Sequence, residues 1–106
     1  LVPERLRVGQ LEHLPGLERD IAVVVPEAVG SGQIEAVIRE AGGPNLRAVT
    51  LFDQYRGTPL EATEKSLAYR LRFEFVDDGP GAEAVDPAMD RVVAVLSERL
   101  GARLRS

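Results

Sequence analysis

The chain has 106 residues, of which 44% are hydrophobic and 28% are charged, and its formal net charge is −4. This composition is typical of one soluble globular domain with a modest core, and it argues against disorder. The absence of cysteine excludes disulfides, zinc–thiolate sites and thiol chemistry. No apolar run approaches the roughly 20 residues of a membrane helix. We therefore expect a cytoplasmic protein without a membrane partner.

The negative net charge counts mildly against nucleic acid as a partner of the whole surface, because proteins dedicated to that task are usually basic. The charges are nevertheless unevenly distributed along the chain. Acidic residues gather between positions 77 and 90, whereas one predicted hairpin carries Arg56, Lys65, Arg70 and Arg72. A locally positive sheet face on an acidic domain is consistent with this pattern.

The first 14 residues alternate briefly at Arg5-Leu6-Arg7-Val8 and are predicted to be a linker or a short extra strand, with the domain proper spanning 15–106. His13 is the only histidine. A lone histidine is expected to be a surface group here, because a metal site needs several donors together.

The first strand of the domain is predicted over residues 17–25, directly after the turn signal Pro15-Gly16. Residues 21–25 are apolar on both faces, as in a central strand. A helix is then predicted from Ser31, as its N-cap, to about Ala41. Its apolar positions share one stripe, and Gly42-Gly43-Pro44 ends it. The stripe consists of Ile34, Val37, Ile38 and Ala41.

Two further strands are predicted at 45–56 and 65–76, joined by a connection that carries Gly57 and Pro59. The second of them alternates without a break, which is typical of a half-buried strand. Its apolar face consists of Leu67, Tyr69, Leu71, Phe73 and Phe75, and its polar face includes Ser66, Arg70 and Arg72.

A second helix is predicted to begin with Asp86 as N-cap and Pro87 at the first helical position. Gly101 suits the left-handed position just past its end, and residues 102–105 are long enough for a short last strand. The apolar face of this helix is expected to be Met89, Val92, Val93, Leu96 and Leu100.

The order strand, helix, strand, strand, helix, strand predicts an α+β, ferredoxin-like βαββαβ sandwich. Both helices should cover one face of a four-stranded antiparallel sheet and leave the other face open.

A search for chemistry finds no catalytic set, cofactor site or metal site. Gly30-Ser31-Gly32 lacks the third glycine of a phosphate-binding loop, because Glu35 stands in its place. Ser66 has only His13 as a candidate base, and nothing places the two together. The acidic residues at 77–86 lack the spacing of a calcium loop. These features predict a binding or assembly module.

Tyr55 is the most informative aromatic residue. If Phe52 points into the core, alternation places Asp53 and Tyr55 on the open face. A tyrosine ring can stack on a nucleobase, worth roughly 1–3 kcal/mol per base, while a carboxylate accepts hydrogen bonds from a purine edge. Ser66 would point to the same side from the next strand. Residue types alone favour the plainer alternative, in which Tyr55 closes the edge of the core and Asp53 is an ordinary surface acid.

The same parity places Val49 and Leu51 on the open face, where apolar side chains are out of place. Either a β-bulge shifts the register, or residues 1–14 or another domain cover them.

Four segments occur in order and at intervals that carry a resemblance. They are 15–25 (PGLERDIAVVV), 51–57 (LFDQYRG), 65–73 (KSLAYRLRF) and 101–105 (GARLR). Together they resemble the ferredoxin-fold anticodon-binding domain at the C-terminus of the phenylalanyl-tRNA synthetase beta subunit. The likeness extends from Pro15 to Arg105, nearly the whole chain.

The resemblance implies recognition of the anticodon stem-loop of tRNA(Phe), without DNA as a partner. It implies that Tyr55 stacks on an anticodon base and that Asp53 and Ser66 make polar contacts there. Basic residues nearby would contact phosphates or bases, namely Lys65, Arg70 and Arg56. Aminoacylation by the parent phenylalanine–tRNA ligase would occur in other domains or subunits, which would be the remaining partners.

Two loops depart from the family pattern. The family usually has a glycine just before the Lys-Ser pair, whereas this chain has Ala62-Thr63-Glu64, and Glu64 brings an acid toward the expected RNA face. An acidic, Gly-Pro-rich segment at 78–84 replaces the family's usual opening of the second helix. A second hypothesis therefore stands beside the first: a stand-alone domain of the same fold that binds a protein or small ligand through its open sheet, without tRNA.

Overall fold

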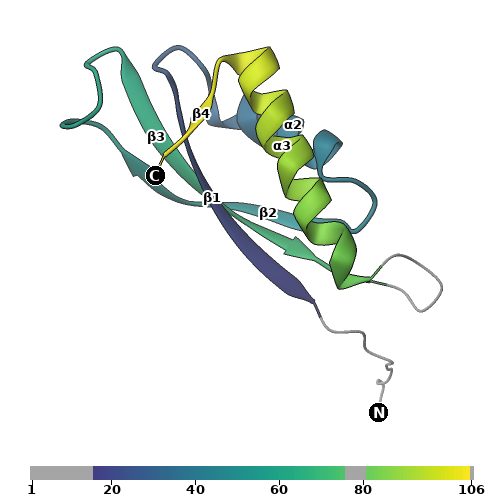
Figure 1. Ribbon diagram of the computed structural model, residues 1–106. Helices are drawn as coiled ribbons and strands as arrows, with labels where there is room; N and C mark the ends of the chain where they lie inside the picture. The colour runs from purple at the N-terminus through teal and green to yellow at the C-terminus, as the bar shows by residue number, and fades with distance from the viewer. Residues whose placement is uncertain (1–15, 76–80, 106) are drawn as a thin grey trace.

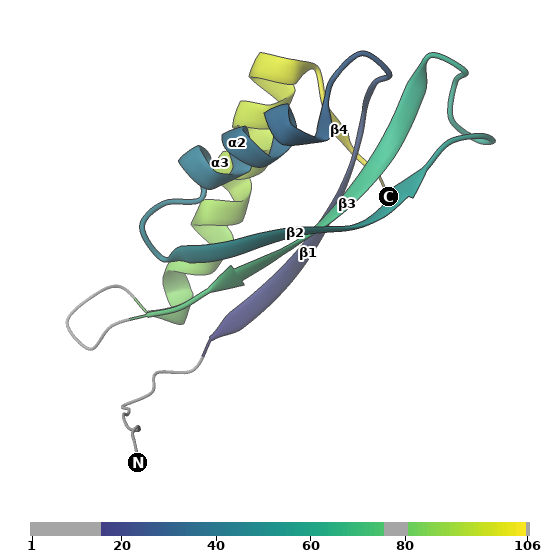
Figure 2. The same ribbon diagram turned by 180° about the vertical axis from the view of Figure 1, so that it is seen from behind.

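Two helices cover one side of a four-stranded antiparallel sheet, and their absence from the other side is visible in both views of the chain (Figures 1 and 2). The computed structural model describes residues 16–75 and 81–105. The strands lie in the order β2-β3-β1-β4. The elements are β1 Leu17–Pro26, α2 Ser31–Ala41, β2 Leu46–Tyr55, β3 Glu64–Phe73, the 3-10 turn η1 Ala82–Ala84, α3 Val85–Leu100 and β4 Arg103–Leu104.

This order confirms the predicted ferredoxin-like βαββαβ fold. The predicted extra strand in residues 1–14 lies outside the described ranges. Neither α2 nor α3 is long and apolar enough to cross a membrane.

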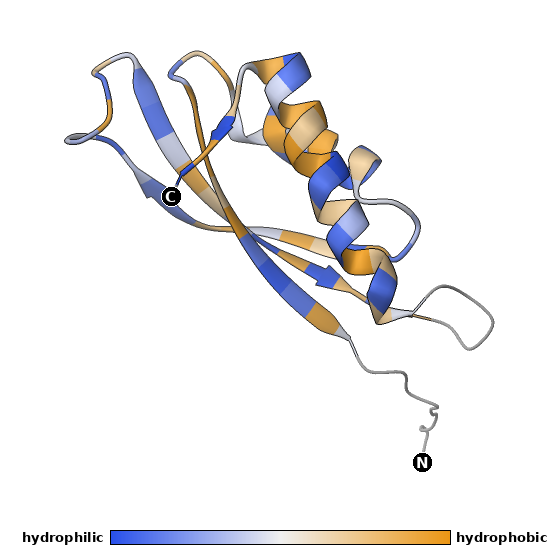
Figure 3. Ribbon diagram, viewed as in Figure 1, coloured by the Kyte–Doolittle hydropathy of each residue, from blue (hydrophilic) through white to orange (hydrophobic). Residues whose placement is uncertain are grey.

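The core lies between the sheet and the helices and follows the predicted alternation of β3. Every second residue of that strand faces the helices and is buried, and each helix contributes one apolar stripe. Burying such a side chain stabilises the fold by about 1.5–3 kcal/mol. Figure 3 shows that the second half of β1 is mainly hydrophobic and that its first half is mainly hydrophilic. Buried side chains include Leu67, Tyr69, Leu71 and Phe73 of β3, Ile34 and Ile38 of α2, and Val92 and Leu96 of α3.

The two helices begin at different residues from those predicted. The prediction of Ser31 as N-cap is wrong, because Gly30 holds that position and its amide donates to Oε1 of Gln33 at 2.8 Å. The predictions for Asp86 and Pro87 are also wrong, because α3 begins at Val85, directly after η1. Burial explains the earlier start, since Val85 is the first residue of the buried stripe that continues through Ala88.

A β-bulge in β2 resolves the parity conflict along that strand. Leu51 lies opposite Tyr69, but the next paired residue is Asp53, opposite Ala68, so that Phe52 is the extra residue. The expectation that Phe52 points into the core is wrong. The ladder places Val49 and Leu51 on the helix side of the sheet, and Val49 joins the core.

Gly101 ends α3 in the predicted left-handed conformation, with φ of +67°. Gly101→Ala is expected to lower the free energy of unfolding by about 1–2 kcal/mol, because a Cβ clashes with the carbonyl in this conformation. Urea unfolding followed by circular dichroism measures the difference. The matched control is Gly32→Ala in α2, where an added Cβ meets no atom within 4 Å and the backbone is helical. A loss for Gly32→Ala equal to that for Gly101→Ala would contradict the argument from backbone conformation.

Candidate nucleic-acid interface

The helix-free side of the sheet, here called the open face, carries a row of neighbouring residues across all four strands. Tyr55 of β2 lies opposite Ser66 of β3, which lies opposite Val24 of β1, which lies opposite Arg103 of β4. Residues directly opposite each other in antiparallel strands point to the same side. Other members of the open face are Asp20, Ala22, Thr50, Asp53, Ala68 and Arg70.

Tyr55 is the last residue of β2, and its ring is held in place from two directions. Its hydroxyl donates to the carbonyl of Thr58 in the connection to β3, where Gly57 has φ of +112°. The guanidinium of Arg105 lies over the ring, 4.8 Å from its centroid. The side chain remains 37% exposed, so the prediction that Tyr55 lies on the open face is confirmed.

Arg105 reaches Tyr55 from the opposite edge of the sheet. Its amide donates to the carbonyl of Ala22 at 2.9 Å, which continues the pairing of β4 with β1. Strands β1 and β3 separate this edge from β2, so the side chains of Arg105 and Tyr55 extend toward each other over these two strands. Ala22 and Ala68 lie opposite each other beneath this contact, and their small side chains leave room for it. Sequence reasoning did not find Arg105, because only the folded sheet brings the two residues together.

Ser66 is 3% exposed, although it lies on the open face. Among the described residues, nothing forms a hydrogen bond with its hydroxyl. An unpaired buried hydroxyl costs about 1–3 kcal/mol in proteins, and such groups are normally satisfied by water or a ligand. Ser66 is therefore a buried polar group opposite Tyr55 whose hydroxyl has no hydrogen-bond partner in the described part of the chain.

Asp53 is exposed on the same face, and its carboxylate has no ion pair or hydrogen bond with any residue in the described ranges. Neighbouring carboxylates differ in this respect. Asp20 accepts two hydrogen bonds from Arg70, at 2.9 and 3.0 Å, and Glu64 accepts two from Arg103, at 2.6 and 3.2 Å. Asp53 is thus free to accept hydrogen bonds from a ligand.

The paired carboxylates remain ionised at neutral pH. Hydrogen bonds from Arg70 lower the pKa of Asp20, and those from Arg103 lower the pKa of Glu64. Because each arginine is also neutralised by its partner, phosphate binding at either one has to replace an existing ion pair. The acid that Glu64 was expected to bring to this face is therefore matched by a base.

Two of the predicted site residues do not join the open face. Lys65 is 7% exposed, lies opposite Val25 on the same side as Leu67, and has its Nζ 3.7 Å from Glu27. Arg56 follows the end of β2 and donates two hydrogen bonds of 2.7 Å to the same glutamate. The alternation in the sequence already indicated this side for Lys65, because a residue two positions before the buried Leu67 points to the same side of the strand.

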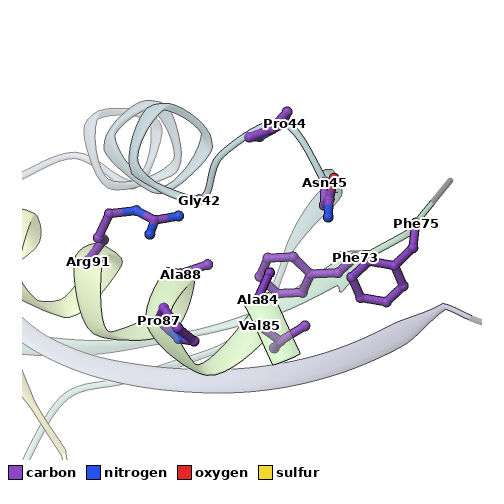
Figure 4. A pocket seen from close by; sticks show the side chains of 10 residues that line it. All are labelled: Gly42, Pro44, Asn45, Phe73, Phe75, Ala84, Val85, Pro87, Ala88 and Arg91. Carbon is purple, nitrogen blue, oxygen red and sulfur yellow. The ribbon is translucent and has the colours of Figure 1, made fainter. Parts of the chain in front are cut away.

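A separate cavity of about 320 Å³ lies on the helix side, between the start of α3 and the end of β3 (Figure 4). Phe73 and Phe75 line it together with apolar residues of α3. The guanidinium of Arg91, which lines the cavity, already donates to the carbonyl of Ala41 at 3.3 Å. Ligand sites need free polar groups that fix orientation, so this cavity is the weaker candidate.

A split βαβ sandwich that presents an aromatic ring and free polar groups on its helix-free sheet has the architecture of a sheet-based RNA-binding module. Comparison with known families makes the assignment specific. The chain belongs to the family of the ferredoxin-fold anticodon binding domain, whose model matches residues 13–105. The resemblance stated from the sequence is confirmed.

Similar proteins carry one common description. The chain is 47% identical over 103 residues to the phenylalanine–tRNA ligase beta subunit of Moorella thermoacetica, which covers 94% of this chain and 13% of that protein. It is 43% identical over 95 residues to the beta subunit of Anaeromyxobacter dehalogenans (90% and 12%) and 40% identical over 97 residues to that of Streptomyces avermitilis (92% and 12%). The chain therefore spans about an eighth of the length of these relatives.

Proposed function

We propose that the open face recognises the anticodon of tRNA(Phe), with one unpaired base stacked on Tyr55. The observation that carries the proposal is the meeting of an exposed ring with two polar groups that have no hydrogen-bond partner among residues 16–75 and 81–105, the Ser66 hydroxyl and the Asp53 carboxylate. Family membership and the shared description of the relatives support tRNA as the ligand.

Each of the three residues has a separate role in this proposal. The Tyr55 ring supplies stacking, which tolerates any base. The Asp53 carboxylate accepts hydrogen bonds from the amino and imino groups of a purine, and the Ser66 hydroxyl can donate or accept. Single-stranded RNA is read in this manner, with splayed bases stacked on aromatic rings and bonded along their edges. We propose that the domain contributes recognition within a longer synthetase subunit, while aminoacylation occurs in other parts of that enzyme.

Arg105 is the open-face arginine best placed to assist. In the described part of the chain it has no carboxylate partner, and it already lies against Tyr55. It can accompany the stacked base or contact the adjoining phosphate. Since Arg70 and Arg103 are paired with acids, few phosphate contacts are available, and we expect the isolated domain to bind RNA weakly.

The test is titration of the tRNA(Phe) anticodon stem-loop into the wild type, Tyr55→Ala and Tyr55→Phe. Tyr55→Ala is expected to lose about 1–3 kcal/mol of binding free energy, whereas Tyr55→Phe retains the ring and most of the affinity. Fluorescence anisotropy measures the binding free energy of each variant, and its repetition at several salt concentrations measures the electrostatic contribution. An unchanged isotherm for Tyr55→Ala would remove the stacking role of Tyr55.

A stem-loop with an altered anticodon and a DNA hairpin of the same sequence are the ligand controls. Weaker binding of both is expected, because base edges and the RNA 2′-hydroxyl contribute to recognition. If the folded wild type binds none of the three ligands at low salt, the RNA proposal is wrong. A protein or small-molecule partner for the open face would then be the better hypothesis.

A further inference from the structure

The bulge in β2 turns a second aromatic ring toward the open face. Phe52 is the extra residue of that bulge, and it is 47% exposed. Its ring lies 4.7 Å from the guanidinium carbon of Arg70, a residue that lies opposite Asp20 and Thr50 on the open face. Burial of a phenylalanine side chain is normally favourable by about 1.5–3 kcal/mol, so a ring left half in water on this face needs an explanation.

The guanidinium of Arg70 is fixed in orientation as well as position. Asp20 receives its Nε and one terminal nitrogen in a two-pronged pair, at 2.9 and 3.0 Å. Such pairs impose a defined plane on the guanidinium. The result is a ring and a planar cation in contact, held from a central strand. Both groups are surfaces on which unpaired nucleobases stack.

We propose that Phe52 and Arg70, oriented by Asp20, form a second nucleobase subsite, which takes a base neighbouring the one stacked on Tyr55. This inference rests on the proposed RNA-binding function of the open face. Phe52 and Tyr55 are three positions apart in the sequence, which corresponds to about 10 Å along a strand. A single nucleobase cannot cover both rings, so two or more nucleotides are needed to occupy both subsites.

The decisive experiment compares Phe52→Ala with Tyr55→Ala, using guanosine monophosphate and the tRNA(Phe) anticodon stem-loop as ligands. Phe52→Ala is expected to weaken stem-loop binding about fivefold or more, the lower end of the stacking range. Binding of the mononucleotide should weaken less, because it can occupy only one subsite at a time and the Tyr55 subsite remains. Tyr55→Ala is expected to weaken both. Phe52→Leu keeps the apolar bulk but removes the aromatic ring, and should resemble Phe52→Ala.

Leu104→Ala serves as the matched control for loss of an exposed apolar side chain. Leu104 is 52% exposed on β4 and lies opposite Val23, on the other side of the sheet. It should leave stem-loop binding unchanged. Circular dichroism of all variants checks that they fold.

Salt dependence distinguishes stacking by Arg70 from an ordinary phosphate contact. Loss of a phosphate contact reduces the slope of affinity against salt by about one unit, whereas loss of stacking leaves the slope unchanged. Arg70→Lys retains the charge but loses the planar group, and is expected to weaken stem-loop binding at constant slope. The matched control is Arg99→Lys. Arg99 lies on α3, on the helix side of the sheet, and its guanidinium is 2.7 Å from the carboxylate of Glu40. This substitution should leave stem-loop binding unchanged.

The outcomes separate the two proposals. Loss of binding in Tyr55→Ala with full binding in Phe52→Ala overturns the second subsite and leaves the proposed function intact. Loss in Phe52→Ala alone supports the second subsite and removes the role of Tyr55. Stem-loop binding that is unchanged in both variants, or absent in the wild type, overturns both.

Discussion

Replacing Leu67 with alanine is expected to lower the free energy of unfolding by about 2–5 kcal/mol, the largest effect that we predict for a single substitution. Leu67 is fully buried in β3, the strand that is hydrogen-bonded to both β1 and β2. Its neighbours across the two ladders are Val23 and Gln54. Because β3 has paired strands on both sides, the surrounding backbone cannot readily collapse into the cavity left by the substitution.

The measurement is urea unfolding followed by circular dichroism, with Leu104→Ala as the matched exposed leucine. Leu104→Ala should change the free energy of unfolding by less than about 0.5 kcal/mol, as is usual at the surface. Equal losses in the two variants would contradict the assignment of Leu67 to the core.

Leu67 also connects the core to the binding surface. It lies between Ser66 and Ala68, whose side chains point to the open face. We therefore expect Leu67→Ala, tested well below its unfolding midpoint, to weaken RNA binding less than Tyr55→Ala does. The leucine supports the strand and does not itself meet the ligand.

The layered arrangement could be predicted from the sequence because two periodicities are explicit in it. Alternation from Leu67 to Phe73 defined β3 and its buried face, and the spacing of Ile34, Val37 and Ile38 defined α2. These patterns depend on local geometry alone. The placement of both helices on one face of the sheet then followed from the rules that govern crossovers.

The sequence offered a β-bulge in this strand as one of two explanations for the parity of Val49 and Leu51, but its position at Phe52 could not be predicted, because no glycine or proline marks it. Its presence depends on burial of Val49 on one side and pairing of Asp53 with Ala68 on the other. The sequence therefore predicted the correct side of the sheet for Tyr55, although the premise that Phe52 points into the core was wrong. The start of α3 was missed for a similar reason, since Asp86-Pro87 is a strong local signal but burial of Val85 outweighs it.

The candidate site was predicted in part. Tyr55, Asp53, Ser66 and Arg70 share the open face as expected, whereas Lys65 and Arg56 gather around Glu27. Charge type alone does not indicate the side of a sheet to which a residue points. The alternation along β3 predicts that Lys65 points to the same side as Leu67, away from the open face. Arg105 could not be found, because its contact with Tyr55 spans the width of the sheet and exists only after folding.

Tyr69→Phe is expected to change stability in opposite directions at neutral and at high pH. The Tyr69 hydroxyl donates to the carbonyl of Ser31 at 2.9 Å and links β3 to the start of α2. Removing it should lower the free energy of unfolding by about 1 kcal/mol near pH 7, the usual net value of one hydrogen bond.

High pH reverses the comparison because of the environment of the phenol. Burial, and to a smaller extent the charge of Glu35, raise the pKa of Tyr69 to about 12 in the folded chain. The unfolded chain has the ordinary value of about 10, so it loses its proton first. Stability from the protonated phenol is therefore fully present below pH 10 and is lost as the pH rises toward 12, at no more than about 1.4 kcal/mol per pH unit.

Phenylalanine has no proton to lose, so Tyr69→Phe should lack this decline and become the more stable variant at about pH 11 to 12. Urea midpoints at several pH values between 8 and 12, compared with those of the wild type, measure the crossing. A constant difference between Tyr69→Phe and the wild type over this range would show that the Tyr69 phenol titrates alike in the folded and unfolded chains, and that its burial does not oppose ionisation.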